Sequence, residues 1–280
     1  MNSDTTPRFR TSTPGQHRPA GGHGATVRTD RHPALDLIDP DGPVRGDLLV
    51  LPHAGGSPGQ YRFLRDHVPA TTRMAIARYP GREKRLGEPF APSLGHLADE
   101  VATASSASGL RRPVILGHSM GGLLAVEVAR RLLPDPDLAP PAVVISGRGP
   151  ATTADGTQIH TRGDDELVAR IYALGATPVG LLDPPDARAL FLPPVRDDYR
   201  LVETYVPTST EPLPIPVHCF AGDDDPTVAV DEVAACAELT TERFDLTVFP
   251  GGHFFLSENP VAVGTALSRI LAHYQEPDPE

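Results

Sequence analysis

The residues VILGHSMGG at positions 114–122 carry the strongest structural signal in this sequence. The first three residues are apolar and typical of a short buried strand, and a helical pattern follows Ser119 and ends before Pro134. Gly117 and Gly121 leave room for a tight, strained turn, since side chains at these positions would collide with neighbouring backbone. The stretch predicts a strand, a sharp turn and a helix, with Ser119 at the turn.

Ser119 in this setting is a candidate nucleophile. A strand, a tight glycine-flanked turn and a helix are the context of the nucleophile elbow in the α/β-hydrolase fold. A serine hydroxyl is a weak nucleophile at neutral pH, so it needs a nearby base, and the base needs an acid to hold its tautomer. In this fold the chain order is serine, then aspartate or glutamate, then histidine.

The base and the acid are predicted from two later strand ends. The next-to-last predicted strand leads into GDDDP at 222–226, and the last leads into GGH at 251–253. The carboxyl ends of parallel strands meet at one edge of a sheet, where sites assemble. We therefore predict His253 as the base and Asp225 as its acid. The alternatives for the acid are Asp223 and Asp224.

The other histidines fit the base less well. His53 also ends a strand and flanks glycines, but it precedes Ser119, which is the wrong order for this fold. His118 is held beside the nucleophile by the turn. The rest fall in the N-terminal segment, a strand, predicted helices or the inserted region: His17, His23, His32, His67, His96, His160, His218 and His273.

Two backbone amides are candidates for the oxyanion hole. In this fold one donor is the residue after the nucleophile and the other comes from the loop after an earlier strand. Met120 supplies the first. The loop HAGG at 53–56 follows the predicted strand 48–52, so Ala54 is the second.

Short apolar runs alternate with longer helical patterns from Asp47 onward, which predicts an α/β fold with a mostly parallel sheet flanked by helices. The predicted strands are 48–52, 74–79, 114–117, 142–146, 216–221 and 246–249. The last predicted helix covers 259–274 and carries a continuous apolar stripe.

One segment, residues 151–212, has no strand candidate and contains helical fragments at 166–174 and 187–201. We predict a helical lid inserted over an acyl pocket; the alternative is a helical excursion that only fills out the fold.

Length and composition predict one large domain. The chain has 280 residues, 39% of them hydrophobic, which is enough for one well-buried core. Residues 1–45 are rich in Pro, Gly, Thr, Arg and His without apolar periodicity, and we expect a disordered leader. The hydrolase domain is expected at 46–275, followed by a disordered tail at 276–280.

Charge and hydropathy exclude several classes of protein. The net charge of −11 argues against general binding to nucleic acid or to anionic membranes. Neither a membrane-spanning apolar run nor a secretory signal is present, so we expect a cytoplasmic protein. Cys219 and Cys236 fall in a predicted strand and a predicted helix, and we expect both to be reduced.

No metal or other cofactor is expected. The acidic run at 223–225 lacks the alternating ligands, central glycine and closing glutamate of an EF-hand. A single metal held by His53, His118 and His253 would lack a helix-borne ligand pair and would leave Ser119 unexplained.

Four stretches together carry a family resemblance. They are LPHAGGS at 51–57, YPGREKR at 79–85 with Glu88-Pro89, GHSMGG at 117–122 and FPGGHFFL at 249–256. The chain resembles the type II thioesterases that accompany modular polyketide and nonribosomal peptide synthases. LPPVRDDY at 192–199 also looks like the lid pattern of that family, whereas the long leader is a departure from it.

The resemblance implies hydrolysis of acyl groups from the phosphopantetheine arm of an acyl or peptidyl carrier protein, which clears stalled or misprimed synthase modules. A monomer is expected. Three alternatives stay open: a chain-releasing thioesterase or acyltransferase, a general carboxylesterase, and a binding protein without activity. One further hypothesis is that local positive charges steer an acidic carrier protein to the site. These charges are Arg78, Arg82, Lys84, Arg85, Arg111 and Arg112.

Overall fold

A seven-stranded sheet forms the centre of the protein. The computed structural model describes residue 1 and residues 32–150 and 158–274. The strand order is β1-β3-β2-β4-β5-β6-β7. The bounds are β1 (Leu35–Ile38), β2 (Gly46–Leu51), β3 (Thr72–Ala77), β4 (Val114–His118), β5 (Val143–Ser146), β6 (Val217–Gly222) and β7 (Phe244–Phe249). Among the strands of the described ranges only β1 is antiparallel to its neighbour, so the predicted mostly parallel sheet is confirmed.

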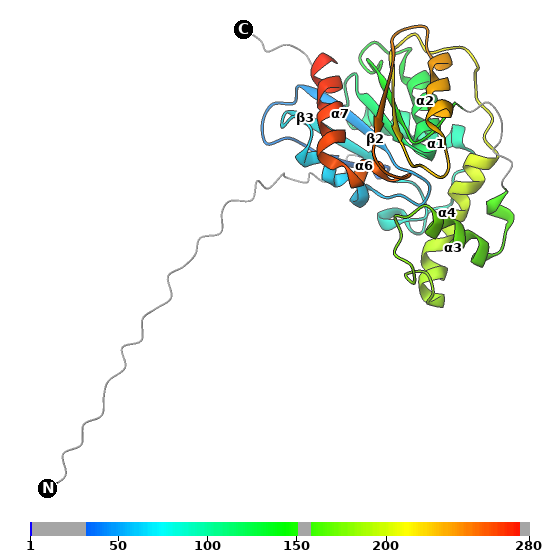
Figure 1. Cartoon of the computed structure of the whole chain (residues 1–280). Coiled ribbons are helices and arrows are strands. Elements are labelled where there is room, and N and C mark those ends of the chain that lie inside the picture. Colours follow the sequence, from blue (N-terminus) through cyan, green and yellow to red (C-terminus); the bar gives the residue numbers. More distant parts are fainter. Residues whose placement is uncertain (2–31, 151–157, 275–280) are drawn as a thin grey trace.

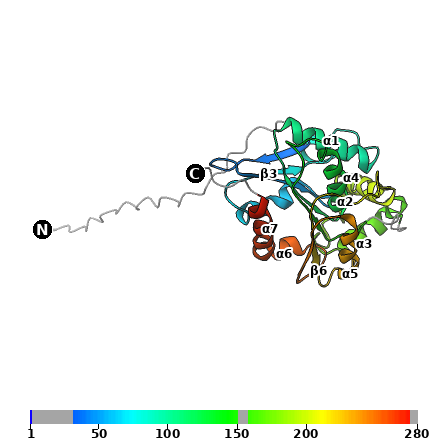
Figure 2. The same ribbon diagram turned by 90° about the horizontal axis from the view of Figure 1, so that it is seen from above.

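Helices cover both faces of this sheet and also build the inserted region. They are α1 (Leu94–Ala107), α2 (Met120–Leu132), α3 (Asp164–Ala173), α4 (Pro185–Glu203), α5 (Val230–Ala234), α6 (Phe255–Glu258) and α7 (Pro260–Tyr274). Short 3-10 helices are η1 (Pro58–Asp66), η2 (Glu83–Arg85), η3 (Ile159–Thr161) and η4 (Ala235–Leu239). Figures 1 and 2 show α1 and α2 on one side of the strands and α7 on the other.

The alternation of side chains along each strand builds two cores. In β2, Leu49 and Leu51 join the core that contains α1 and α2, whereas Leu48 and Val50 join the core that contains α7. All four side chains are fully buried. A parallel sheet covered on both faces needs such continuous apolar strands, and this is why the runs were recognisable in the sequence.

All six predicted strands are present, but the boundary of the predicted leader was wrong. Residues 1–45 were expected to be disordered, yet Leu35–Ile38 form β1, paired with β3. Asp36 stands inside this strand, buried and ion-paired with Arg62 and Arg78. Most of the predicted leader, at 2–31, and the predicted tail at 276–280 lie outside the described residues.

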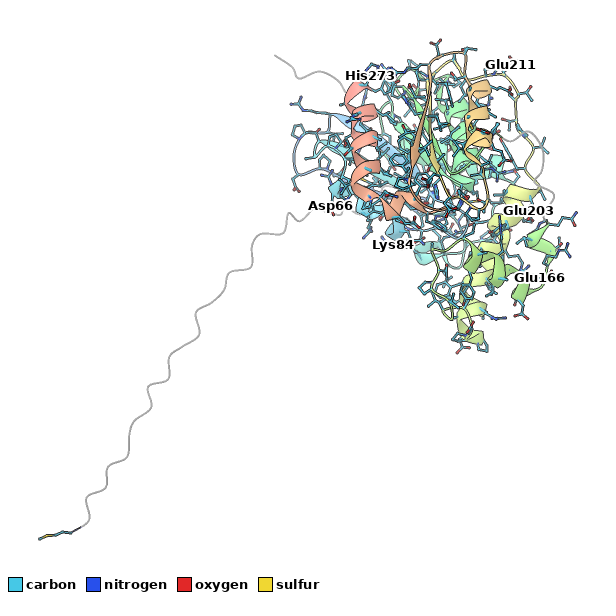
Figure 3. All side chains as sticks on the ribbon, in the orientation of Figure 1. Asp66, Lys84, Glu166, Glu203, Glu211 and His273 are labelled. Atoms are coloured by element: carbon cyan, nitrogen blue, oxygen red, sulfur yellow. The ribbon has the colours of Figure 1, made fainter. Side chains whose placement is uncertain are left out.

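The described part of the inserted region contains helices joined by turns and irregular segments. Residues 158–212 contain η3, α3 and α4 and no strand. Leu167, Val168, Leu182 and Leu192 form a small separate core there. Figures 1 and 3 show α3 and α4 together on the side away from α7, with Glu166 and Glu203 on them. Its use as a lid stays a prediction.

Within the described ranges, each helix is too short or too polar to cross a lipid bilayer.

Candidate active site

The turn between β4 and α2 holds Ser119 in a strained conformation. Its backbone has φ 55° and ψ −115°, a conformation that residues other than glycine seldom adopt. A Cβ on Gly117 would lie 1.9 Å from the Gly121 carbonyl oxygen, and one on Gly121 would lie 1.9 Å from the Leu51 carbonyl oxygen. Both glycines are therefore required for the chain to pass, and Ser119 is held at the tip of a sharp elbow.

His253 and Asp225 are in direct contact. The His253 Nδ1 lies 2.7 Å from Asp225 Oδ2, and both side chains are almost completely buried. Since a carboxylate only accepts, Nδ1 carries the hydrogen in this contact and Nε2 keeps its lone pair. The loops after β6 and β7 thus deliver a histidine in the tautomer that a general base needs.

Thr227 holds the carboxylate in place. Its amide and its hydroxyl both donate to Asp225 Oδ1 at 2.8 Å, and the hydroxyl lies 3.0 Å from His253 Nδ1. Burial alone would raise the pKa of Asp225, but hydrogen bonds from His253 and Thr227 lower it below its ordinary value. Asp225 is thereby kept as the anion that stabilises a protonated His253.

The two alternative aspartates lie elsewhere. Asp223 Oδ1 accepts from the Gly251 amide at 2.9 Å, and both Asp223 and Asp224 are exposed. The structure brings Asp225, and neither neighbour, to His253.

Ser119 and His253 line the same cleft, which has a volume of about 500 Å³. Within the described ranges no hydrogen bond joins the Ser119 hydroxyl to His253. Such contacts often tighten only in the substrate complex. The inserted helical region contributes part of the wall through Arg170, Leu174, Tyr199 and Val202.

The two candidate oxyanion donors are the backbone N–H groups of Ala54 and Met120. Ala54 lines the cleft, and Met120 is the first residue of α2. Among the residues described, neither amide has a hydrogen-bond acceptor in the protein. Amides at the first turn of a helix lack an intrahelical partner, so Met120 can donate to a bound oxyanion.

Two further histidines pack beside His253. The ring centroids of His118 and His253 are 5.1 Å apart, and those of His53 and His118 are 6.0 Å apart. Burial and the nearby His253 lower the pKa of His53 to about 3 and lower that of His118 well below its ordinary value. His53 Nδ1 lies 2.6 Å from the Tyr61 hydroxyl. Both imidazoles thus resist protonation, which does not suit a base that must become cationic.

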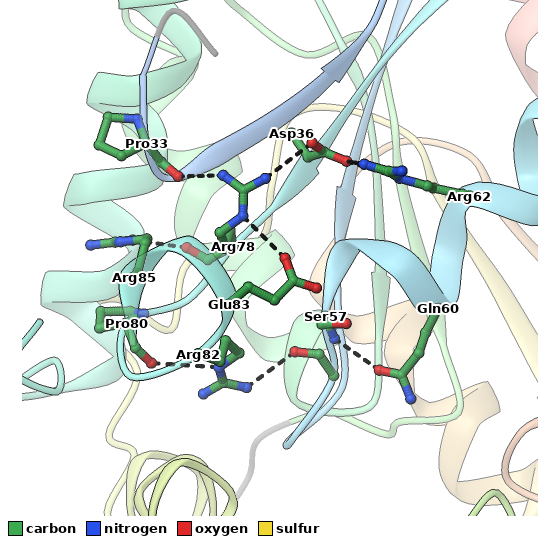
Figure 4. Close-up of polar contacts among 11 residues, drawn as sticks. Pro33, Asp36, Ser57, Gln60, Arg62, Arg78, Pro80, Arg82, Glu83 and Arg85 are labelled. Carbon is green, nitrogen blue, oxygen red and sulfur yellow. Dashed lines mark hydrogen bonds and ion pairs between the residues drawn. The ribbon is translucent and has the colours of Figure 1, made fainter. Parts of the chain in front are cut away.

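The arginines expected to form a positive docking surface are mostly internal. Arg78, Arg82 and Arg85 are 2%, 8% and 4% exposed. Arg78 binds Asp36 at 3.0 Å and Arg82 binds Asp198 at 2.7 Å; Figure 4 shows all three arginines turned toward protein partners. The steering hypothesis was therefore wrong for these three. The exposed members of the set are Lys84, Arg111 and Arg112.

Sequence reasoning missed Thr227 and Asp198. Thr227 follows Asp225 by two positions, the spacing at which an aspartate accepts a backbone N–H in a tight turn, so a local signal existed. Asp198 pairs with Arg82 across 116 positions of sequence, and nothing local indicated that contact.

The sheet order, the elbow and the histidine–carboxylate pair at one sheet edge define an α/β-hydrolase fold. The family model for the thioesterase domain matches residues 47–271. The chain belongs to the thioesterase domain family.

Two relatives illustrate this. The chain is 38% identical over 225 residues to a probable cadicidin biosynthesis thioesterase of Streptomyces griseus, which covers 80% of this chain and 62% of the relative. It is 34% identical over 229 residues to Thioesterase PikA5 of Streptomyces venezuelae, covering 81% of this chain and 79% of that one. The chain thus spans less than two thirds of the first relative.

Solved structures agree with this family assignment. BorB, a type II thioesterase from the borrelidin biosynthetic cluster, is 31% identical, with a TM-score of 0.78 over 88% of this chain and 100% of BorB. YbtT, a type II thioesterase of the yersiniabactin pathway, is 26% identical, with a TM-score of 0.76 over 86% of this chain and 98% of YbtT. The predicted resemblance to type II thioesterases is confirmed.

Proposed function

We propose that this enzyme hydrolyses acyl groups from the phosphopantetheine arm of carrier proteins and so clears blocked modules of a polyketide or nonribosomal peptide synthase. The observation that carries the proposal is the buried His253–Asp225 pair, which opens on the same cleft as Ser119. The similarity to BorB, from the borrelidin biosynthetic cluster, and to YbtT, from the NRPS/PKS pathway of yersiniabactin, supports the substrate class.

In the first half-reaction, the Ser119 hydroxyl oxygen attacks the thioester carbonyl carbon while His253 Nε2 takes the hydroxyl proton. Asp225 stabilises the resulting imidazolium. The carbon–sulfur bond then breaks, and the pantetheine sulfur leaves with the proton from His253. The acyl group remains on Ser119 as an ester.

In the second half-reaction, His253 takes a proton from a water molecule, which attacks the ester carbonyl. The tetrahedral intermediate collapses, the Ser119 oxygen recovers its proton from His253, and the free acid is released. The proton transfers in both half-reactions are carried out by His253, with Ser119, the pantetheine sulfur and water as the proton donors and acceptors.

The negative oxygen of each intermediate would be held by the amides of Ala54 and Met120. Each such donor is typically worth about 100- to 1,000-fold in rate. The absence of protein acceptors for both amides in the described residues supports this role.

The acyl chain would lie against the inserted helical region. Leu174 and Val202 from that region and Val228 and Phe254 from the sheet side give the cleft apolar wall. We propose that α3 and α4 act as the lid.

The buried free thiols Cys219 and Cys236 fit a reducing compartment, and we propose a cytoplasmic location.

The test compares one acyl group on a carrier protein with the same group on a simple alcohol ester. We expect a higher kcat/KM for the carrier thioester, and loss of both activities in Ser119→Ala. A preference for the alcohol ester would instead support a general carboxylesterase.

A further inference from the structure

Asp198 of α4 reaches out of the inserted region and contacts the loop that contains Ala54. Its Oδ2 accepts from the Gly55 amide at 2.7 Å, directly beside the candidate oxyanion donor. The side chain is 2% exposed, although α4 belongs to a segment far away in the sequence.

Arg82 completes this contact from a third segment. Its two terminal nitrogens each lie 2.7 Å from one oxygen of Asp198, which is a bidentate pair. One of these nitrogens also donates to the Gly56 carbonyl at 3.1 Å. The guanidinium carbon lies 5.3 Å from the centre of the Tyr79 ring, and the Tyr79 hydroxyl donates to the Pro52 carbonyl at 2.9 Å.

The polar contacts therefore hold the chain before and after Ala54, at the Pro52 carbonyl, the Gly55 amide and the Gly56 carbonyl. The sterics agree, since Gly55 has φ 80° and a Cβ there would lie 2.8 Å from the Cγ2 of Val195 on α4. The loop is thus packed against α4 as well as bonded to it.

We propose that Asp198 and Arg82 are positioning residues for the oxyanion hole. They hold the Ala54 amide at the cleft and make its position depend on the packing of α4 against the loop at 53–56. The oxyanion hole is therefore complete only while α4 is packed on this loop. This inference rests on the proposed function, because it assigns a task to the Ala54 amide in the same reaction.

A buried ion pair could instead serve stability alone, and the chain contains a matched pair that separates the two roles. Asp47 and Arg73 are bidentate at 2.7 and 2.6 Å. Asp47 also accepts a backbone amide, from Arg111 at 2.6 Å, and Arg73 donates to the Gly109 carbonyl at 2.6 Å. Asp47 stands at the start of β2, the opposite end from the loop at 53–56.

The experiment compares Asp198→Asn with Asp47→Asn. Asparagine keeps the size of the side chain and one oxygen acceptor but removes the charge. We expect Asp198→Asn to lower kcat about tenfold or more with KM within about twofold, since one oxyanion donor is worth roughly 100-fold or more. Asp47→Asn should lower the melting temperature but leave kcat unchanged below it.

A second readout does not depend on a carrier protein. A phosphonate probe on Ser119 places an oxygen in the oxyanion hole, so its labelling rate should fall in Asp198→Asn and not in Asp47→Asn. Arg82→Lys keeps the charge but loses the bidentate contact with Asp198, and its labelling rate should fall by a smaller factor. This variant replaces Asp198→Asn in the comparison if Asp198→Asn does not fold.

Equal kcat and equal labelling rates in the Asp198, Arg82 and Asp47 variants would overturn the inference. A wild-type enzyme that labels at Ser119 but does not cleave carrier thioesters would contradict the proposed function instead, while the labelling comparison would still decide the role of Asp198.

Discussion

Thr227 joins the two members of the candidate histidine–carboxylate pair. It gives two hydrogen bonds to one oxygen of Asp225, which leaves the other oxygen to meet His253. A carboxylate fixed in this way holds the imidazole in one tautomer and one orientation, and both are needed before Ser119 can lose its proton.

Asp225→Asn should lower kcat about 1,000- to 10,000-fold, because the amide can donate to Nδ1 and so favour the wrong tautomer of His253. Steady-state kinetics on an acyl thioester checks this. Asp224→Asn is the control, because Asp224 is exposed and adjacent to Asp225 in sequence; it should stay within about twofold of wild type. A larger loss in the control would mean that the acid was assigned to the wrong carboxylate.

The spacing after the predicted strands was sufficient to select His253 and to prefer Asp225, because strand ends in a parallel sheet meet at one edge. It could not select Asp198. Its contact with Arg82 depends on how α4 packs on the loop at 53–56, and no local pattern encodes that packing.

His53→Asn should make the protein less sensitive to acid. The pKa of His53 is lowered to about 3 in the folded protein, while an unfolded histidine has a pKa of about 6.5. The folded state therefore binds fewer protons between these values, and stability falls as pH drops below about 6.5. This proton uptake should lower the free energy of unfolding of the wild type by about 2 kcal/mol at pH 5 relative to pH 8. The same decrease should be smaller by about 2 kcal/mol in His53→Asn.

Urea unfolding of the two proteins at pH 8 and pH 5 measures this difference. His96→Asn changes an exposed histidine and should follow wild type. If His53→Asn also follows wild type, His53 is not held neutral in the folded protein.

At the scale of elements, β1 is the one strand in the described part of the chain that the sequence did not predict. It has only four residues, and Asp36 interrupts its apolar pattern. The buried carboxylate is tolerated because Arg62 of η1 and Arg78, the residue after β3, neutralise it. Both arginines are distant from Asp36 in sequence and come close to it only in the folded sheet. The local sequence pattern therefore assigned β1 to the leader.

Gly121→Ala should destabilise the elbow by about 3 kcal/mol, because the new methyl group would meet the Leu51 backbone and neither element can move away. The measurement is the free energy of unfolding in urea. Gly87→Ala is the control, since a Cβ there would meet nothing within 4 Å, and should change stability by less than about 0.5 kcal/mol. Similar values for both variants would show that the elbow is not tightly packed.

At the scale of the whole molecule, the net charge is −11, and the arginines of the Pro-Gly-Arg region are buried and paired, so they present no positive surface. An acidic carrier protein should therefore be repelled at long range rather than steered.

The kcat/KM for an acidic carrier substrate should rise about two- to threefold between low and physiological salt, because ions screen this repulsion. A small uncharged thioester measured in parallel should show no change. A fall in kcat/KM with salt, confined to the carrier substrate, would indicate an attractive surface.

The most direct measurement of the proposed chemistry is the intact mass of an acyl carrier protein incubated with the enzyme. Wild type should remove the acyl mass from the phosphopantetheine arm, and Ser119→Ala should leave the carrier acylated. Removal of the acyl group by Ser119→Ala at the wild-type rate would contradict the account.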